Sequence, residues 1–105
     1  MVLEVPPEQV LALRAALARD RDHFLAIAAE PDQLDEDREE AVHCVSLAAS
    51  WIAELPRLEV GDDAAGHYLA PLLEHYAGAA LEKGDFAHAR DLLALRALLG
   101  PGVLS

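Results

Sequence analysis

The sequence is poor in cysteine and in positive charge. Its 105 residues include one cysteine, Cys44, which excludes an internal disulfide and a zinc site built from several cysteines. Eight Lys and Arg residues stand against 19 Asp and Glu residues, so the formal net charge is −11. Nucleic acids and anionic membrane surfaces attract clustered positive charge, and this balance therefore argues against direct binding to either.

Sequence signals for a sheet fold, for secretion, for a membrane span and for common catalytic motifs are scarce as well. Five aromatic residues and few β-branched residues disfavour a sheet protein. Glu4 and Glu8 stand where a secretory signal would be positively charged, and the charge-free stretch 44–53 is too short to span a bilayer. The sequence has no Gly-rich phosphate loop and no Gly-x-Ser-x-Gly motif. We therefore expect a cytoplasmic protein without a cofactor. Arg outnumbers Lys seven to one, a bias typical of GC-rich bacterial genomes.

Helix-forming residues are abundant, since 21 alanines and 19 leucines make up 40 of the 105 residues. Apolar residues recur at three- and four-residue steps, and Pro, Gly and capping residues divide this pattern. It predicts helices over about 7–29, from a cap at Asp32 or Asp35 to about residue 55, over 63–83 and over 86–99. Pro71 should either kink the third helix or mark its true first turn. The short connections predict one all-α domain over residues 1–105, with a four-helix up-down bundle as the first arrangement.

The stretch 77–101 carries a further pattern. It has, in order, a small residue, a turn, an aromatic residue, a small residue, a large apolar residue and a terminal proline: Ala77, Gly84-Asp85, Phe86, Ala89, Leu93 and Pro101. This order resembles part of a tetratricopeptide repeat (TPR). Ala80 and Arg96 depart from the tyrosine and the small residue usual in that family. The resemblance implies TPR-like helical hairpins as the alternative fold, and a role in protein interaction.

Two helices carry unusual apolar surfaces. The second predicted helix is apolar almost all round, which predicts that it lies at the centre of the fold. On the fourth, we expect a core face made of Phe86, Ala89, Leu92 or Leu93, and Leu99. Leu95 and Leu98 would then lie exposed on the opposite side, followed by Val103 and Leu104 in the tail. Because contiguous exposed apolar surface is typical of an interface, these four residues predict a homodimer.

Asp20 is the one acid that falls clearly in an apolar register, on the same face of the first helix as Leu13 and Leu17. One interpretation is a polar pocket formed by Asp20, Asp22 and His23 with Tyr68 or Tyr76. The alternative, which we favour at this stage, is that Asp20 turns outward or pairs with Arg19 or Arg57.

Four of the five histidines follow a carboxylate by three or four residues, which places both side chains on one face of a helix. Such spacing also occurs in metal-binding bundles. A metal-dependent hydrolase or oxidase is therefore the rival function, with ligands drawn from Asp20, His23, Glu40, His67 and Glu74. Pairing on the surface is the simpler interpretation, so we assign no metal. Cys44 has little positive charge nearby and is expected to pack in the core rather than act as a nucleophile.

The segment 30–40 holds seven carboxylates and one Arg. Such a run is commonly a solvated loop and helix start, but it could also attract a basic partner. We take Glu36, Asp37, Glu39 and Glu40 as the candidate acidic partner surface. The sequence thus predicts a small acidic protein-interaction or regulatory module, homodimeric and not an enzyme. An acidic inhibitor that mimics nucleic acid is a further alternative.

Overall fold

The computed structural model describes residues 1–100 and confirms the all-α prediction. Its main helices are α1 (Pro7–Ala29), α2 (Asp35–Glu54), α4 (Ala70–Glu82) and α5 (Phe86–Leu98). A short helix, α3 (Asp62–Ala64), and a π-helical segment, η1 (Ala65–Leu69), precede α4. Two short strands complete the described part, β1 (Val2–Glu4) and β2 (Arg57–Glu59). The N-cap of α2 is Leu34 with no side-chain hydrogen bond, so the expected cap by Asp32 or Asp35 is wrong.

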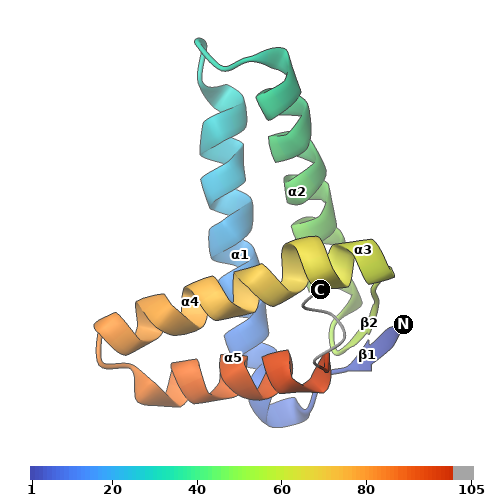
Figure 1. The fold of residues 1–105 in the computed structure, drawn as a ribbon, viewed down its shortest axis with the longest axis vertical. Helices are drawn as coiled ribbons and strands as arrows, with labels where there is room; N and C mark the ends of the chain where they lie inside the picture. Colours follow the sequence, from blue (N-terminus) through green and yellow to red (C-terminus); the bar gives the residue numbers. More distant parts are fainter. Residues whose placement is uncertain (101–105) are drawn as a thin grey trace.

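The helices form two hairpins. Helices α1 and α2 pack side by side as the first hairpin, and α4 and α5 form the second, which lies across the lower part of α1 (Figure 1). The arrangement is all-α and bundle-like, with the two hairpins crossing (Figure 1). The far end of the α1–α2 hairpin projects beyond the second hairpin (Figure 1).

The two short strands lie where the chain passes between the hairpins. Strand β2 pairs antiparallel with β1, and Leu3 lies opposite Leu58 with both side chains buried. The N-terminal amino group also donates a hydrogen bond of 2.8 Å to the Val60 carbonyl oxygen. This pairing was not predicted, because three residues are too few to show an alternating pattern.

Helix α1 is the centre of the fold. It contacts α2, α4 and α5, and Leu13, Ala16 and Leu17 are fully buried on it. The predicted central position of the second helix is wrong. On α2 only Ala41, Ala48 and Trp51 are buried. Many of its remaining apolar side chains are small, so it fills less of the core than the leucine-rich face of α1 does.

The buried face of α5 differs from the predicted one. It is formed by Ala89, Leu92 and Leu95, with Leu99 just beyond the helix end. Leu95 is 0% exposed, so its predicted place on an exposed interface is wrong, whereas Leu98 is 51% exposed. Phe86, expected in the core, is 68% exposed. The helix has apolar side chains on more than one side, and the stripe with Leu92 and Leu95 is the one buried, in a helix that contacts α4 and α1. The predicted interface residues Val103 and Leu104 lie outside the described residues.

Pro71 is accommodated without ending the helix. The backbone stays helical from Asp62 to Glu82, close to the predicted span 63–83. Because proline has no amide hydrogen, the turn before it loses one regular bond. That turn widens into η1, where the Ala70 N–H donates to the Ala65 carbonyl oxygen, five residues back. The π turn shifts the helix face that carries Tyr68, and π turns recur at functional sites in proteins.

None of the helices in residues 1–100 combines the length and the apolar character that crossing a membrane would require.

The revised face of α5 makes a testable prediction. Leu95→Ala removes a fully buried side chain and should lower the free energy of unfolding by about 2–5 kcal/mol. Leu98→Ala removes a half-exposed side chain from the same helix and should cost less than about 1 kcal/mol. Urea unfolding followed by circular dichroism measures both. Equal losses in the two variants would contradict the placement of α5.

Candidate functional site

The most distinctive polar group of the fold is the carboxyl group of Asp20. It lies one turn beyond Leu17 on the buried face of α1, and only 8% of the residue is exposed. In the described part of the chain it is the only buried polar or charged residue. Removing a carboxylate from water is costly unless hydrogen bonds replace its hydration, so its partners define the site.

Two tyrosine hydroxyls from the second hairpin supply these hydrogen bonds. The Tyr68 hydroxyl donates to Asp20 Oδ2 at 2.5 Å, and the Tyr76 hydroxyl donates to Oδ1 at 3.2 Å. Tyr68 lies in the π turn and Tyr76 two turns further along α4, so both rings face α1. The Trp51 ring supports Tyr68 from α2, with centroids 5.5 Å apart.

The polar-pocket interpretation of Asp20 is therefore confirmed, with both tyrosines rather than one. The favoured alternative is wrong, because Asp20 is buried and forms no ion pair with Arg19 or Arg57 within residues 1–100. Asp22 does not join the site: it is exposed and pairs with Arg21 at 3.3 Å.

The surroundings of Asp20 keep both phenols protonated. Burial, followed by the hydrogen bond and negative charge of Asp20, raises the pKa of Tyr68 well above its usual range. Burial and the charge of Asp20 raise the pKa of Tyr76 to about 12, although Arg19 acts in the opposite direction. Burial, then the charges of Asp20 and Glu40, also raise the pKa of the Cys44 thiol. All three groups are thus neutral at physiological pH and are poor nucleophiles.

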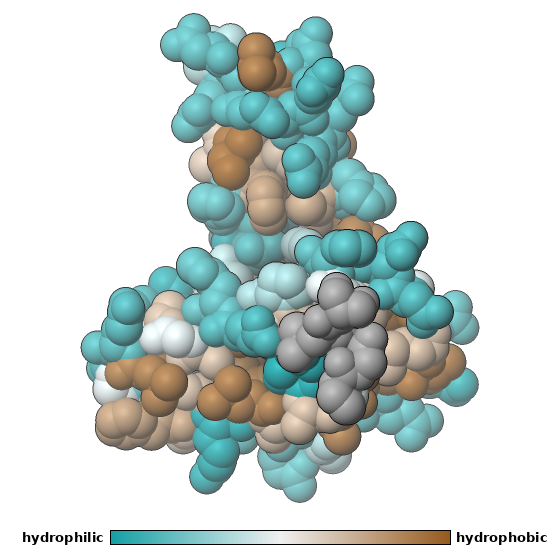
Figure 2. All heavy atoms as spheres, in the orientation of Figure 1, coloured by the Kyte–Doolittle hydropathy of each residue, from teal (hydrophilic) through white to brown (hydrophobic). Residues whose placement is uncertain are grey.

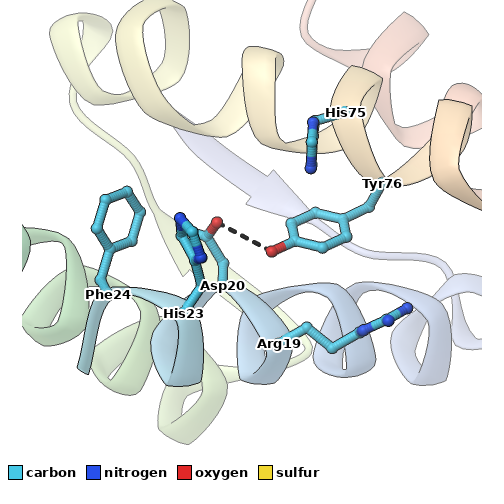
Figure 3. Close-up of a pocket in the computed structure, with 6 residues that line it drawn as sticks. All are labelled: Arg19, Asp20, His23, Phe24, His75 and Tyr76. Carbon is cyan, nitrogen blue, oxygen red and sulfur yellow. Dashed lines mark hydrogen bonds between the residues drawn. The ribbon is translucent and has the colours of Figure 1, made fainter. Parts of the chain in front are cut away.

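A pocket opens beside Asp20, between α1 and α4 (Figure 3). Its volume is about 470 Å³, and it is lined by Arg19, Asp20, His23, Phe24, His75 and Tyr76. His23 and Phe24 come from α1 and lie opposite His75 and Tyr76 from α4 (Figure 3). A smaller pocket of about 230 Å³ lies next to it and shares Asp20, Phe24 and His75, with His67, Tyr68, Pro71 and Leu72 completing its lining.

The ligands of the rival metal-enzyme hypothesis are not gathered. Asp20, His23 and His67 line these two pockets, but Glu40 is exposed on α2 and Glu74 pairs with Arg96 at 3.0 Å. Within residues 1–100 no three His, Cys, Asp or Glu side chains lie close enough together to hold a metal ion.

The predicted acidic surface lies near the free end of the α1–α2 hairpin. Glu36, Asp37, Glu39 and Glu40 are all exposed in the first turns of α2. The one cation of this segment, Arg38, donates to the Glu30 carbonyl oxygen at 3.0 Å and lies 3.9 Å from Asp35. The carboxylates also suit the positive N-terminal end of a helix, so their position is compatible with a purely structural role.

Exposed apolar residues accompany this acidic surface. Leu34 is 70% exposed, and Leu25 and Val42 are about half exposed. Figure 2 shows hydrophilic and hydrophobic spheres side by side at the projecting end. The sequence alone did not reveal this combination, because periodicity does not show which exposed apolar residues lie at the same end of a hairpin.

Comparison with known proteins finds no matching family model, no matching curated protein and no matching solved structure. Helices α4 and α5 form a hairpin, and the tetratricopeptide resemblance of this stretch stays a prediction. The interaction role that it implies stays a prediction.

The tyrosine pairing can be tested directly, because Tyr68 and Tyr76 are the two tyrosines of the chain. Absorbance at 295 nm, which reports phenolate, should rise at clearly higher pH in the native protein than in the urea-unfolded protein. A phenol whose pKa is raised by folding stabilises the fold below the unfolded value of 10.0, and this contribution is lost as pH rises through the folded value, about 12 for Tyr76. The free energy of unfolding should therefore fall above pH 10.

The double variant Tyr68→Phe with Tyr76→Phe provides the control, since its stability should lose less between pH 9 and pH 11 than that of the wild type. Native and unfolded titration curves that coincide would contradict the buried pairing with Asp20.

Proposed function

We propose that this protein is a small interaction module that binds a basic partner protein through the free end of the α1–α2 hairpin. One observation carries the proposal: the projecting end combines a carboxylate-rich segment with large exposed apolar side chains. Carboxylates at such a surface steer an oppositely charged partner and raise the association rate. The apolar side chains would supply contact area once the partner arrives.

The local shape supports a protein partner. A shallow pocket of about 390 Å³ is lined by Asp35, Arg38, Glu39 and Val42, so two carboxylates and one guanidinium group surround one apolar side chain. This arrangement suits an amphipathic helix that presents Lys or Arg beside Leu or Ile side chains. A DNA-mimicking inhibitor would use the same charges, but the exposed leucines favour a partner with an apolar face.

Self-association is the second part of the proposal and rests on α5. Phe86 is 68% exposed and Leu93 is 45% exposed, and seven residues apart they lie on the same side of that helix. They take the place of the buried Leu95 as candidate dimer contacts. Leu98, also exposed, lies on the other flank of the buried stripe. A symmetric dimer is the commonest way to cover such a surface.

The partner surface can be tested with a synthetic amphipathic helix that carries Lys on one face and Leu on the other. We expect the quadruple variant Glu36→Gln, Asp37→Asn, Glu39→Gln and Glu40→Gln to weaken binding by about tenfold, mostly through a slower association rate. Leu34→Ser should weaken binding mainly through faster dissociation. Fluorescence titration and stopped-flow kinetics at two salt concentrations measure these effects.

A matched control removes four exposed carboxylates elsewhere: Glu4→Gln, Glu8→Gln, Glu59→Gln and Glu82→Gln. This variant has the same net charge as the first quadruple variant and should bind nearly as well as the wild type. If both quadruple variants lose affinity equally, the peptide responds only to net charge, and the proposed surface is wrong.

The dimer can be tested by light scattering. The wild type should have twice the mass of one chain, and Phe86→Glu with Leu93→Glu should give a folded monomer. Leu98→Glu is the control for added charge on the other flank and should leave the dimer intact. A wild type that is monomeric at about 100 μM would refute self-association; this concentration exceeds the Kd of most stable dimers.

A further inference from the structure

We propose that the pocket between α1 and α4 binds a small organic monocation, such as a protonated amine, through the Asp20 carboxylate and the surrounding aromatic rings. This site is separate from the hairpin end proposed to bind a protein. It rests on the hydrogen bonds, the charge and the ring arrangement around Asp20.

The first step concerns unbalanced charge. Buried carboxylates in proteins are generally paired with a cation or a metal ion. Asp20 receives two phenol hydrogen bonds, but no Lys, Arg or His in residues 1–100 forms an ion pair with it. Both phenols are neutral donors, so they stabilise the negative charge without cancelling it. Arg19, which also lines the pocket, extends away from Asp20 (Figure 3).

The second step concerns free acceptor sites. A carboxylate offers about four lone-pair positions, and the two tyrosine hydroxyls occupy two of them. Asp20 lines both the larger and the smaller pocket, so this residue borders space that a ligand can enter. An ammonium group there would donate to Asp20 without displacing Tyr68 or Tyr76.

The third step concerns the walls. His23 and Phe24 on one side face His75 and Tyr76 on the other (Figure 3). Aromatic faces attract organic cations, and a carboxylate beside them adds a charge-assisted hydrogen bond to an ammonium group. The volume of about 470 Å³ suits a small amine that carries an apolar group. Arg19 at the edge disfavours a second positive charge, which is why the ligand is a monocation.

Three probes of similar size separate charge from shape: benzylammonium, benzyl alcohol and benzoate. At pH 8, benzylammonium should bind with a Kd of about 1 mM or tighter. Its amide shifts in NMR spectra should map to α1 and α4 around Asp20. Benzyl alcohol and benzoate should bind at least tenfold more weakly. Equal shifts with the alcohol, or no saturable shifts with benzylammonium, would overturn the proposal.

Substitutions of the pocket residues then test what each contributes to benzylammonium binding. Asp20→Asn should abolish saturable binding of benzylammonium, and Phe24→Leu should weaken it several-fold. The control Leu11→Ala changes an exposed apolar side chain outside both pockets and should leave the Kd unchanged. If Asp20→Asn does not fold, Tyr76→Phe decides the matter: it frees a further acceptor position on Asp20 Oδ1, so binding should persist or tighten. Loss of binding in a folded Tyr76→Phe protein would contradict a cation held by Asp20.

Discussion

The buried Asp20 carboxylate and its two tyrosine partners link the two halves of this protein. Asp20 belongs to the first hairpin, whereas Tyr68 and Tyr76 belong to the η1–α4 arm of the second. Leucine packing between α1 and its neighbours supplies apolar burial, but such contacts tolerate small sliding movements. Two hydrogen bonds to one carboxylate do not tolerate such movements, because each carboxylate oxygen must stay within hydrogen-bonding distance of its own tyrosine hydroxyl. The crossing of the hairpins and the pocket beside Asp20 both depend on this pairing.

The π turn before Pro71 is the local feature that makes the pairing geometrically accessible. A proline inside a helix removes a backbone donor, and here the helix responds by widening one turn while its axis continues. Tyr68 lies in that widened turn. Pro71, a residue that normally disrupts helices, therefore lies just after the turn from which Tyr68 of the second hairpin donates its hydrogen bond to Asp20 of the first.

Much of this fold could be predicted from the sequence, because the helices are long and their boundaries are marked by Pro, Gly and Asp. Asp20 could also be singled out, since an acid in an apolar register of α1 has few structural explanations. Its partners could only be suggested, because Tyr68 and Tyr76 lie 48 and 56 residues away along the chain. The position of Leu95 could not be decided: α5 has leucines on more than one side, and periodicity cannot tell which stripe another helix will cover. For the same reason, α2 was predicted to be the central helix, whereas in the structure α1 occupies the centre.

The uneven burial of the α1–α2 hairpin has a consequence for how the molecule opens. Over residues 21–47 a single residue, Ala41, is buried, whereas the part of α1 up to Asp20 contributes a nearly continuous buried face. Local unfolding follows such differences in buried contact, and amide hydrogens exchange fastest where few contacts must break. The outer hairpin is therefore expected to open as a separate cooperative unit while the leucine core and the Asp20 pairing stay closed. A partner bound at this end would disfavour local unfolding of the outer hairpin and slow the exchange of its amide hydrogens. The amides that become protected would then mark the surface that the partner contacts.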